Sequence, residues 1–140
     1  MNVKQLLTAT LLSVALASGA HAQQCEDTAL FAEMETMADT MQGLARAIRG
    51  NDLDSAREAL PTLQQAARNA HQETPFSLRN GGSDQDIANF RAAIGELNEM
   101  IDELDLALAN DNQADAAQAL RAIGDARRNG HRQFKDRSCG

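Results

Sequence analysis

The sequence predicts an all-α protein, an antiparallel up-down-up-down four-helix bundle. The composition is rich in Ala, Leu, Gln, Asp and Glu, and the chain has only four aromatic residues. Apolar residues recur at steps of three and four, the spacing of one face of an α-helix. Short first and third connections between the periodic segments favour antiparallel neighbours.

The first 22 residues precede the predicted bundle and have a different pattern. Lys4 supplies a positive charge, residues 6–17 form an apolar run, and Ala20-His21-Ala22 has small residues at the two positions that a signal peptidase reads. The run is shorter than the roughly 20 residues of a membrane span. We therefore expect residues 1–22 to be a cleaved signal peptide, residues 23–140 to be one domain without a membrane span, and the protein to be periplasmic.

Two apolar seams predict the first pair of helices. The first seam steps by four and three and consists of Leu30, Met34, Met37, Met41, Leu44 and Ile48. Gly50 can end this helix, and Asn51 or Asp52 can cap the next one. The second seam consists of Leu53, Ala56, Leu60, Leu63, Ala67 and Ala70. Pro61 lies within it and lacks a backbone donor, so we expect a kink or a distorted turn there.

A long loop from Thr74 to Ser83 precedes the second pair. Ser83 followed by Asp86 predicts a capping box at the start of the third helix. The third seam consists of Phe90, Ile94, Leu97, Ile101, Leu104 and Leu108. After a turn at residues 110–112, the fourth seam consists of Ala117, Leu120, Gly124, Arg127, His131 and Phe134.

The polar end of the fourth seam requires an explanation. A buried polar group without a partner costs about 1–3 kcal/mol, so Arg127 and His131 are poor choices for a plain core. One explanation is that this stripe turns toward solvent as the helix frays. The other is a cofactor site, because antiparallel topology brings His71, His131 and all four phenylalanines to one pole. Those phenylalanines are Phe31, Phe76, Phe90 and Phe134.

Two cysteines give a second indication of a site. In an oxidising compartment, Cys25 and Cys139 are expected to form a disulfide. Met34 follows Cys25, and His131 precedes Cys139, by similar intervals, which correspond to about 12–14 Å along a helix. Pairing of the cysteines would bring Met34 and His131 to one level. A thioether and a neutral imidazole there suit low-spin haem iron, although a seam methionine taken alone is more often core filler.

Motifs and charge exclude several other classes. The chain has no C-x-x-C-H motif for covalent haem. It also has no Walker loop, G-x-G-x-x-G, H-E-x-x-H or G-x-S-x-G motif, so the enzyme classes that these motifs mark have no support. The net charge of -7 becomes about -8 if Lys4 is removed. This charge argues against nucleic acid or an anionic membrane as a partner and is compatible with a basic protein.

The chain resembles the periplasmic cytochrome b-562 family over nearly all of the predicted domain. The resemblance lies in the order and spacing of four segments, which are Glu33-Met34-Glu35-Thr36, the run from Ala59-Leu60 to Gln72-Glu73-Thr74-Pro75, Asn89-Phe90-Arg91, and Arg127-Arg128-Asn129-Gly130-His131. It implies a four-helix bundle that holds one non-covalent haem b per chain. The family's axial iron ligands fall on Met34 and His131.

The resemblance also implies roles for neighbouring residues. Arg127 and Lys135 fall where the family has basic residues near the haem propionates, and Phe90 falls where a ring packs on the macrocycle. The chain departs from the family at its cysteine pair and at Ile94, where a second aromatic is expected. With both axial positions filled, the resemblance implies an electron carrier with a protein redox partner, and not an enzyme. We expect a monomer, but no residue pattern in the sequence determines the oligomeric state.

Three alternatives remain open from the sequence. The first is a haem-free periplasmic helical module that binds a metal or a protein, although the absence of Glu-x-x-His argues against a di-iron centre. The second is a bis-histidine site in which His71 joins His131. The third is a gas-binding or peroxidase-like haem protein with a labile methionine bond. The sequence leaves the electron donor, the acceptor, the reduction potential and the oligomeric state undetermined.

The predicted disulfide can be tested on the secreted protein. Replacing Cys25 and Cys139 with serine should lower the free energy of unfolding by up to about 4–5 kcal/mol, because the cross-link restricts the unfolded chain. Urea unfolding measures the change, and dithiothreitol should reproduce it in the unmodified protein. Two thiols that react in the denatured, unreduced protein would contradict the pairing.

Overall fold

The computed structural model describes residues 25–135, most of which lie in four long helices. The helices are α2 (Ala29–Arg49), α3 (Leu53–Gln72), α4 (Asp84–Ala109) and α5 (Gln113–Phe134). A short 3-10 helix, η1 (Phe76–Leu78), lies between α3 and α4. No strand occurs between residues 25 and 135, and the all-α prediction is confirmed. The predicted signal peptide and Cys139 lie outside the described residues.

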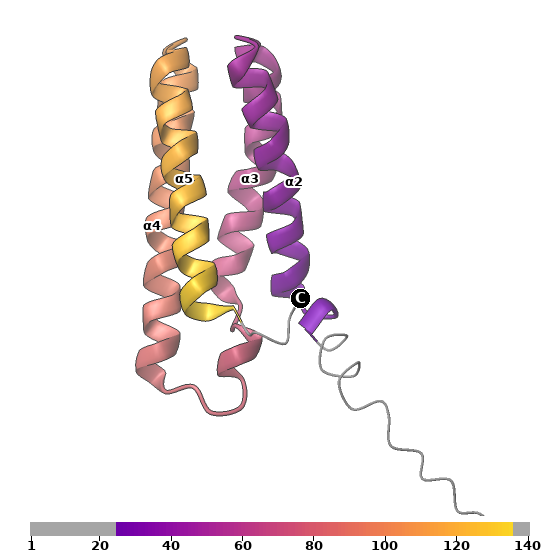
Figure 1. The fold of residues 1–140 in the computed structure, drawn as a ribbon, viewed down its shortest axis with the longest axis vertical. Helices are drawn as coiled ribbons and strands as arrows, with labels where there is room; N and C mark the ends of the chain where they lie inside the picture. The colour runs from indigo at the N-terminus through magenta and orange to yellow at the C-terminus, as the bar shows by residue number, and fades with distance from the viewer. Residues whose placement is uncertain (1–24, 136–140) are drawn as a thin grey trace, which may run out of the picture.

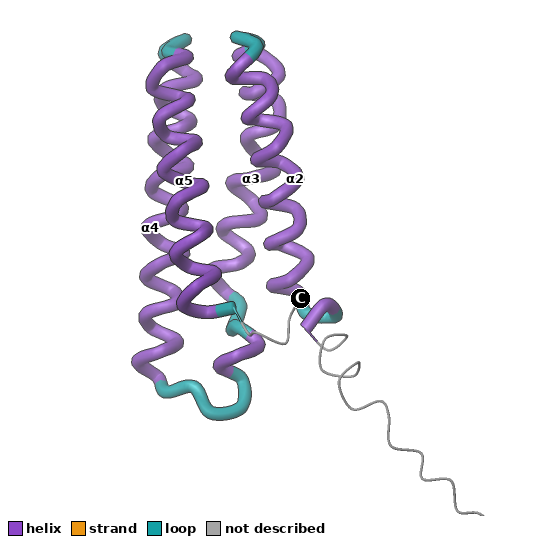
Figure 2. The backbone as a smooth tube through the Cα atoms, in the orientation of Figure 1, coloured by secondary structure: helices purple, strands orange, loops and turns teal. Residues whose placement is uncertain are grey.

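The four helices lie side by side, and successive helices run in alternating directions (Figure 1). Gln113, at the start of α5, donates a 2.6 Å hydrogen bond to the carbonyl of Ile48, near the end of α2. At the opposite pole, the ring centroids of Phe90 in α4 and Phe134 at the end of α5 lie 5.4 Å apart. The connecting segments are confined to the two poles (Figure 2).

Side-chain caps define the helix starts that the sequence predicted. The Asp52 side chain accepts a hydrogen bond from a backbone N–H in the first turn of α3. Ser83 and Asp86 form a reciprocal capping box at the start of α4. Asn51 and Asp111, each just before a cap, adopt φ angles of 56° and 54°. Asn and Asp tolerate this left-handed conformation better than most residues, so neither turn needs glycine at that position. Gly50, which ends α2 as predicted, has a φ angle of -79°.

Pro61 lies inside α3 and does not end it. The helix is continuous from Leu53 to Gln72, and Pro61 is on its exposed face. Its ring faces water instead of the core, where a missing backbone hydrogen bond is less costly. Pro61 is therefore compatible with a helix that carries core residues on its other side.

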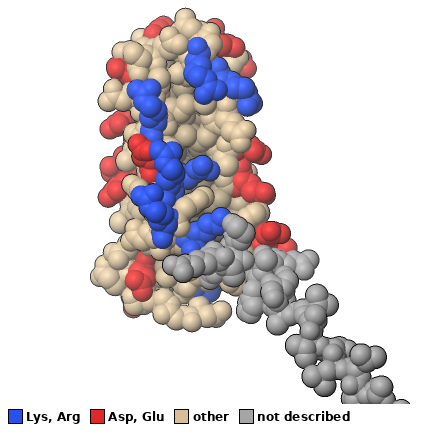
Figure 3. Space-filling view, in the orientation of Figure 1, with Lys and Arg blue, Asp and Glu red and all other residues tan. Residues whose placement is uncertain are grey.

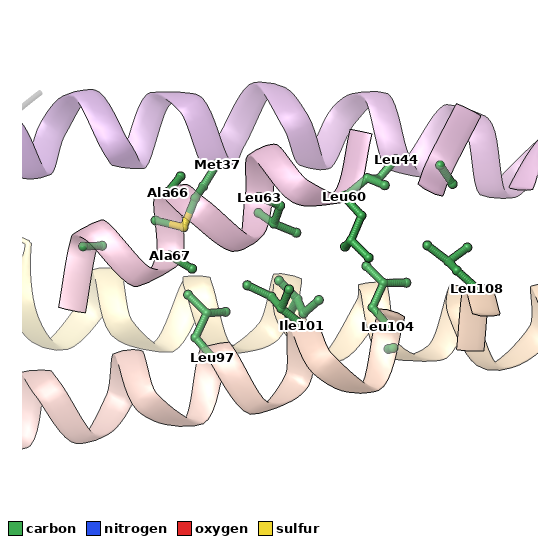
Figure 4. Close-up of a cluster of buried hydrophobic side chains, with 14 of the residues drawn as sticks. Met37, Leu44, Leu60, Leu63, Ala66, Ala67, Leu97, Ile101, Leu104 and Leu108 are labelled. Carbon is green, nitrogen blue, oxygen red and sulfur yellow. The ribbon is translucent and has the colours of Figure 1, made fainter. Parts of the chain in front are cut away.

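The core confirms the predicted seams of α2, α3 and α4. All six predicted α4 positions are buried, as are most of those in α2 and α3. Leucine and isoleucine side chains from these helices meet along the bundle axis (Figure 4). The largest completely buried side chains are Leu44, Ile48, Leu63, Ile101, Leu104 and Leu108.

The predicted seam of α5 is wrong by one residue. The buried side chains are Ala116, Ala119 and Ile123, whereas Leu120 lies on the flank and is partly exposed. Two of these three buried side chains are alanines, and Leu120 packs against the core only from its flank. His131 consequently lies beside the core stripe and not in its centre, and it is half-buried.

No helix between residues 25 and 135 is long and apolar enough to cross a membrane.

Leu104 and Leu106 provide a matched test of the core. Leu104 is 0% exposed and Leu106 is 64% exposed. Leu104→Ala should lower the free energy of unfolding by about 2–5 kcal/mol, because it leaves a cavity. Leu106→Ala should change it by no more than about 0.5 kcal/mol. Urea unfolding of the two variants measures both values, and similar losses would contradict the assigned core.

Candidate functional site

A cavity of about 290 Å³ lies at the pole where α5 ends. It is bounded by α2, α4 and α5, by Leu63 of α3 and by the segment at Pro75 and Phe76. Most of its lining is apolar, including Leu30, Phe31, Met34, Met37, Met41, Leu63, Phe76, Phe90, Ile94, Leu97, Ile123 and Phe134. The volume is near the lower end of the range of about 300–1,000 Å³ that is typical of small-molecule sites.

Local packing explains why the bundle is open at this position. Of the neighbouring helix pairs, α2 and α5 are in the least extensive contact. Small residues, among them Ala38, Ala93, Ala126 and Gly130, line the cavity. A Cβ atom added at Gly130 would meet no other atom within 4 Å. Small side chains therefore leave this space between the helices.

All five residues predicted to hold a cofactor line this one cavity. They are Met34, Phe90, Arg127, His131 and Lys135. Their individual roles are predictions from the sequence and from the family resemblance.

The other residues that the sequence singled out divide into two groups. Cys25 and all four phenylalanines also line the cavity, which agrees with the predicted aromatic pole. His71 is partly buried near the end of α3 but is not part of the lining. The bis-histidine alternative therefore has no support from the geometry.

The sequence reasoning missed Glu35 and the small residues of the wall. Glu35 is exposed and adds a carboxylate to the lining. Ala38, Ala93 and Ala126 are members of the lining next to seam positions. A small residue beside a seam is common in any helix of an Ala-rich chain, so the sequence carried no clear signal for them.

Phenylalanine rings form a rigid part of the wall. Phe90 is 3% exposed and meets the Phe134 ring edge to face, at an interplanar angle of 82°. The hydroxyl of Ser77 donates a 2.6 Å hydrogen bond to the backbone carbonyl of Phe134. This bond ties the η1 segment to the end of α5 and holds Phe76 at the cavity.

The environment of His131 favours a neutral imidazole. Burial is the main factor that lowers the pKa of His131 below 6.5, and the positive charges of Arg127 and Lys135 lower it further. No hydrogen bond to the imidazole is made within residues 25–135. A neutral imidazole has a free nitrogen lone pair, which is the form that binds metal ions.

The polar groups at the cavity mouth indicate the type of ligand. Arg127 of α5 and Lys135, the residue that caps the end of α5, are exposed members of the lining. They can bind the anionic groups of a ligand whose body is flat and apolar. In the described part of the chain, no three His, Cys, Asp or Glu residues are grouped so that they could hold a metal ion by themselves. The arrangement thus suits a metal carried within an organic ligand.

The lowered pKa of His131 predicts a pH effect on the ligand-free protein. At pH values between the pKa of His131 in the folded protein and 6.5, the unfolded chain binds more protons than the folded chain. The unfolding free energy therefore decreases as the pH is lowered through this range. The stability contributed by neutral His131 is fully present above pH 6.5 and is lost as the pH falls through the lowered pKa of His131 in the folded protein. His131→Gln should therefore flatten the decline in unfolding free energy that begins as pH falls below about 6.5.

Urea unfolding at several pH values measures this slope. His71→Gln removes an imidazole away from the cavity and should retain the part of the slope that is due to His131. Equal slopes for the unmodified protein and His131→Gln would contradict the prediction.

Comparison with known proteins identifies the family. The family model for cytochrome b562 matches residues 29–135, which include all four long helices and every residue predicted to hold the cofactor. A comparison with curated proteins gives no match. The matched segment covers most of the chain, so the chain belongs to the cytochrome b562 family, whose members are haem-binding electron carriers and not enzymes.

Proposed function

We propose that this protein is a periplasmic single-electron carrier that binds one non-covalent haem b per chain, with Met34 and His131 as axial ligands. One observation carries the proposal: the thioether and the imidazole line the same apolar cavity in a member of the cytochrome b562 family. When bound, haem supplies a reversible one-electron couple.

Met34 and His131 have the chemistry that the ligands require. The imidazole is supplied largely in its neutral form, because burial and two nearby cations lower its pKa. The thioether of Met34 is an uncharged, soft ligand, which favours the reduced state and raises the reduction potential. Both groups project from helices of a packed bundle, so little reorganisation is needed when an electron is gained or lost.

The remaining lining supports the same ligand. Phe90 and Phe134 exclude water from one part of the cavity and offer flat apolar surfaces. Arg127 and Lys135 at the mouth are suited to bind propionate groups, and their positive charges favour the reduced state electrostatically. The absence of a C-x-x-C-H motif in the sequence is consistent with non-covalent attachment.

The proposed location rests on the sequence and on the family. Residues 1–22 have the pattern of a cleaved signal peptide. Cys25 is 2% exposed beside the cavity. Its pairing with Cys139 would connect the two ends of the domain in an oxidising compartment, and it remains a prediction because Cys139 lies outside the described residues.

Absorption spectra test the function. Oxidised and dithionite-reduced protein titrated with haemin should develop a sharp reduced α band that saturates at one haem per chain. Met34→Ala should weaken haem binding by at least about tenfold, since loss of even outer partners of a metal site costs about 10–100-fold. It should also lower the potential and allow carbon monoxide to bind the reduced form.

Met100→Ala is the matched control. Met100 packs against the core but does not line the cavity, so its replacement should leave the spectrum, the potential and the carbon monoxide response unchanged. If Met34→Ala behaves like Met100→Ala, Met34 is not a ligand. Protein that gains no α band with haemin would rule out the haem function.

A further inference from the structure

The charge of this protein is unevenly distributed. The chain as a whole has a net charge of -7, yet five basic residues and one acidic residue lie between Arg121 and Lys135. A stripe of blue side chains runs along one face of the molecule in Figure 3, with acidic side chains on both sides. We define the basic face of α5 as the exposed residues Arg121, Arg127, Arg128, Arg132 and Lys135.

These five residues lie on one side of α5. At 3.6 residues per turn, they fall within roughly 140° of the helix circumference and extend about 21 Å along it. The arc begins next to the buried stripe that contains Ile123, and His131 falls within it. The basic face is therefore continuous with the edge of the cavity that carries the proposed iron ligand.

The basic face also borders the cavity mouth. Arg127 and Lys135 belong both to the cavity lining and to the exposed surface. A protein that docks on this face would approach the cofactor where its pocket opens to solvent. Such an approach shortens the path for electron transfer.

Most of these charges are not neutralised by nearby carboxylates. Within residues 25–135, Arg128 forms an ion pair with Asp125, but Arg121, Arg127 and Arg132 form none. Arg121 and Arg132, which do not line the cavity, are thus available to an external anion when haem is bound.

Arg57 at the opposite pole provides a contrast. Its guanidinium forms ion pairs with Asp54 and Asp111 and donates to the carbonyl oxygen of Leu108 at 3.0 and 2.7 Å. Arg57 thereby connects the start of α3 to the end of α4. The arginines of the basic face have no comparable structural task.

We propose that the basic face of α5 is the docking surface for an acidic redox protein, an inference that rests on the proposed electron-transfer function. The partner is a protein with a compact acidic patch around its own redox centre. An anionic membrane or a nucleic acid fits less well, because a broad polyanion would also meet the acidic residues that flank the stripe. The net charge alone was compatible with a basic partner, but charges beyond about 10 Å are largely screened at 0.1 M salt.

Small redox reagents test the local charge. In this experiment, the rates at which anionic ferricyanide and cationic tris(phenanthroline)cobalt(III) oxidise the reduced holoprotein are measured at salt concentrations from about 10 mM to about 500 mM. If the net charge of -7 controlled encounter, salt would speed the reaction with ferricyanide. The proposal predicts that salt slows this reaction, because the reagent is attracted to the basic face.

A charge-reversal pair tests docking itself. The electron acceptor is a plastocyanin with a strongly acidic surface, and rates are measured by stopped flow. Arg121→Glu with Arg132→Glu should slow the reaction by about tenfold or more at low salt and have little effect at high salt. Neither residue lines the cavity, so the α band and the reduction potential should persist.

Arg68→Glu with Arg91→Glu is the matched control, since it makes the same charge change on α3 and α4. It should alter the rate by no more than about twofold. Equal effects of the two pairs, or a ferricyanide reaction that salt accelerates, would overturn the proposal. Binding of anionic vesicles that is lost in Arg121→Glu with Arg132→Glu, without any change in the plastocyanin rate, would also overturn it.

Failure of the proposed function has a different signature. Protein without a haem α band would not react with any of the three acceptors. A normal α band, with rates that are insensitive to the basic face, would overturn only the docking proposal.

Discussion

The interdigitated packing of leucine and isoleucine side chains in the half of the bundle away from the cavity supports the rest of the structure. Leu44, Ile48, Leu104 and Leu108 are at most 1% exposed and come from α2 and α4. A bundle that leaves a cavity at one pole loses packing contacts there and must obtain its stability elsewhere. The tightly packed half, with side-chain caps at its turns, keeps the helices in position around the cavity.

The cavity and the basic face both depend on how α5 is rotated. Ala116, Ala119 and Ile123 face the core, and this rotation leaves His131 at the boundary between the interior and solvent. Burial on one side and cations on the other lower the pKa of this imidazole. The same rotation turns the neighbouring basic side chains outward, so the site and the proposed docking surface are two consequences of one helix orientation.

The sequence predicted much of this arrangement. The seams of α2, α3 and α4, the caps at Asp52 and Ser83, and the pole shared by the phenylalanines agree with the structure. These features depend on local spacing and on topology, both of which are visible in a sequence. The predicted α5 seam was displaced by one residue because Leu120 was taken for a core residue, whereas the buried side chains are Ala116, Ala119 and Ile123.

The sequence by itself determined the fold class, the helix boundaries to within a few residues and the family resemblance that gathers Met34, Phe90 and His131 at one pole. Apolar periodicity and capping residues are sufficient for these, because they act within a helix or across a short turn. Only the tertiary structure decided that His71 lies away from the cavity lining and that an acidic chain presents a basic face at the mouth. Those properties depend on the rotation of each helix about its axis, which is set by packing against its neighbours.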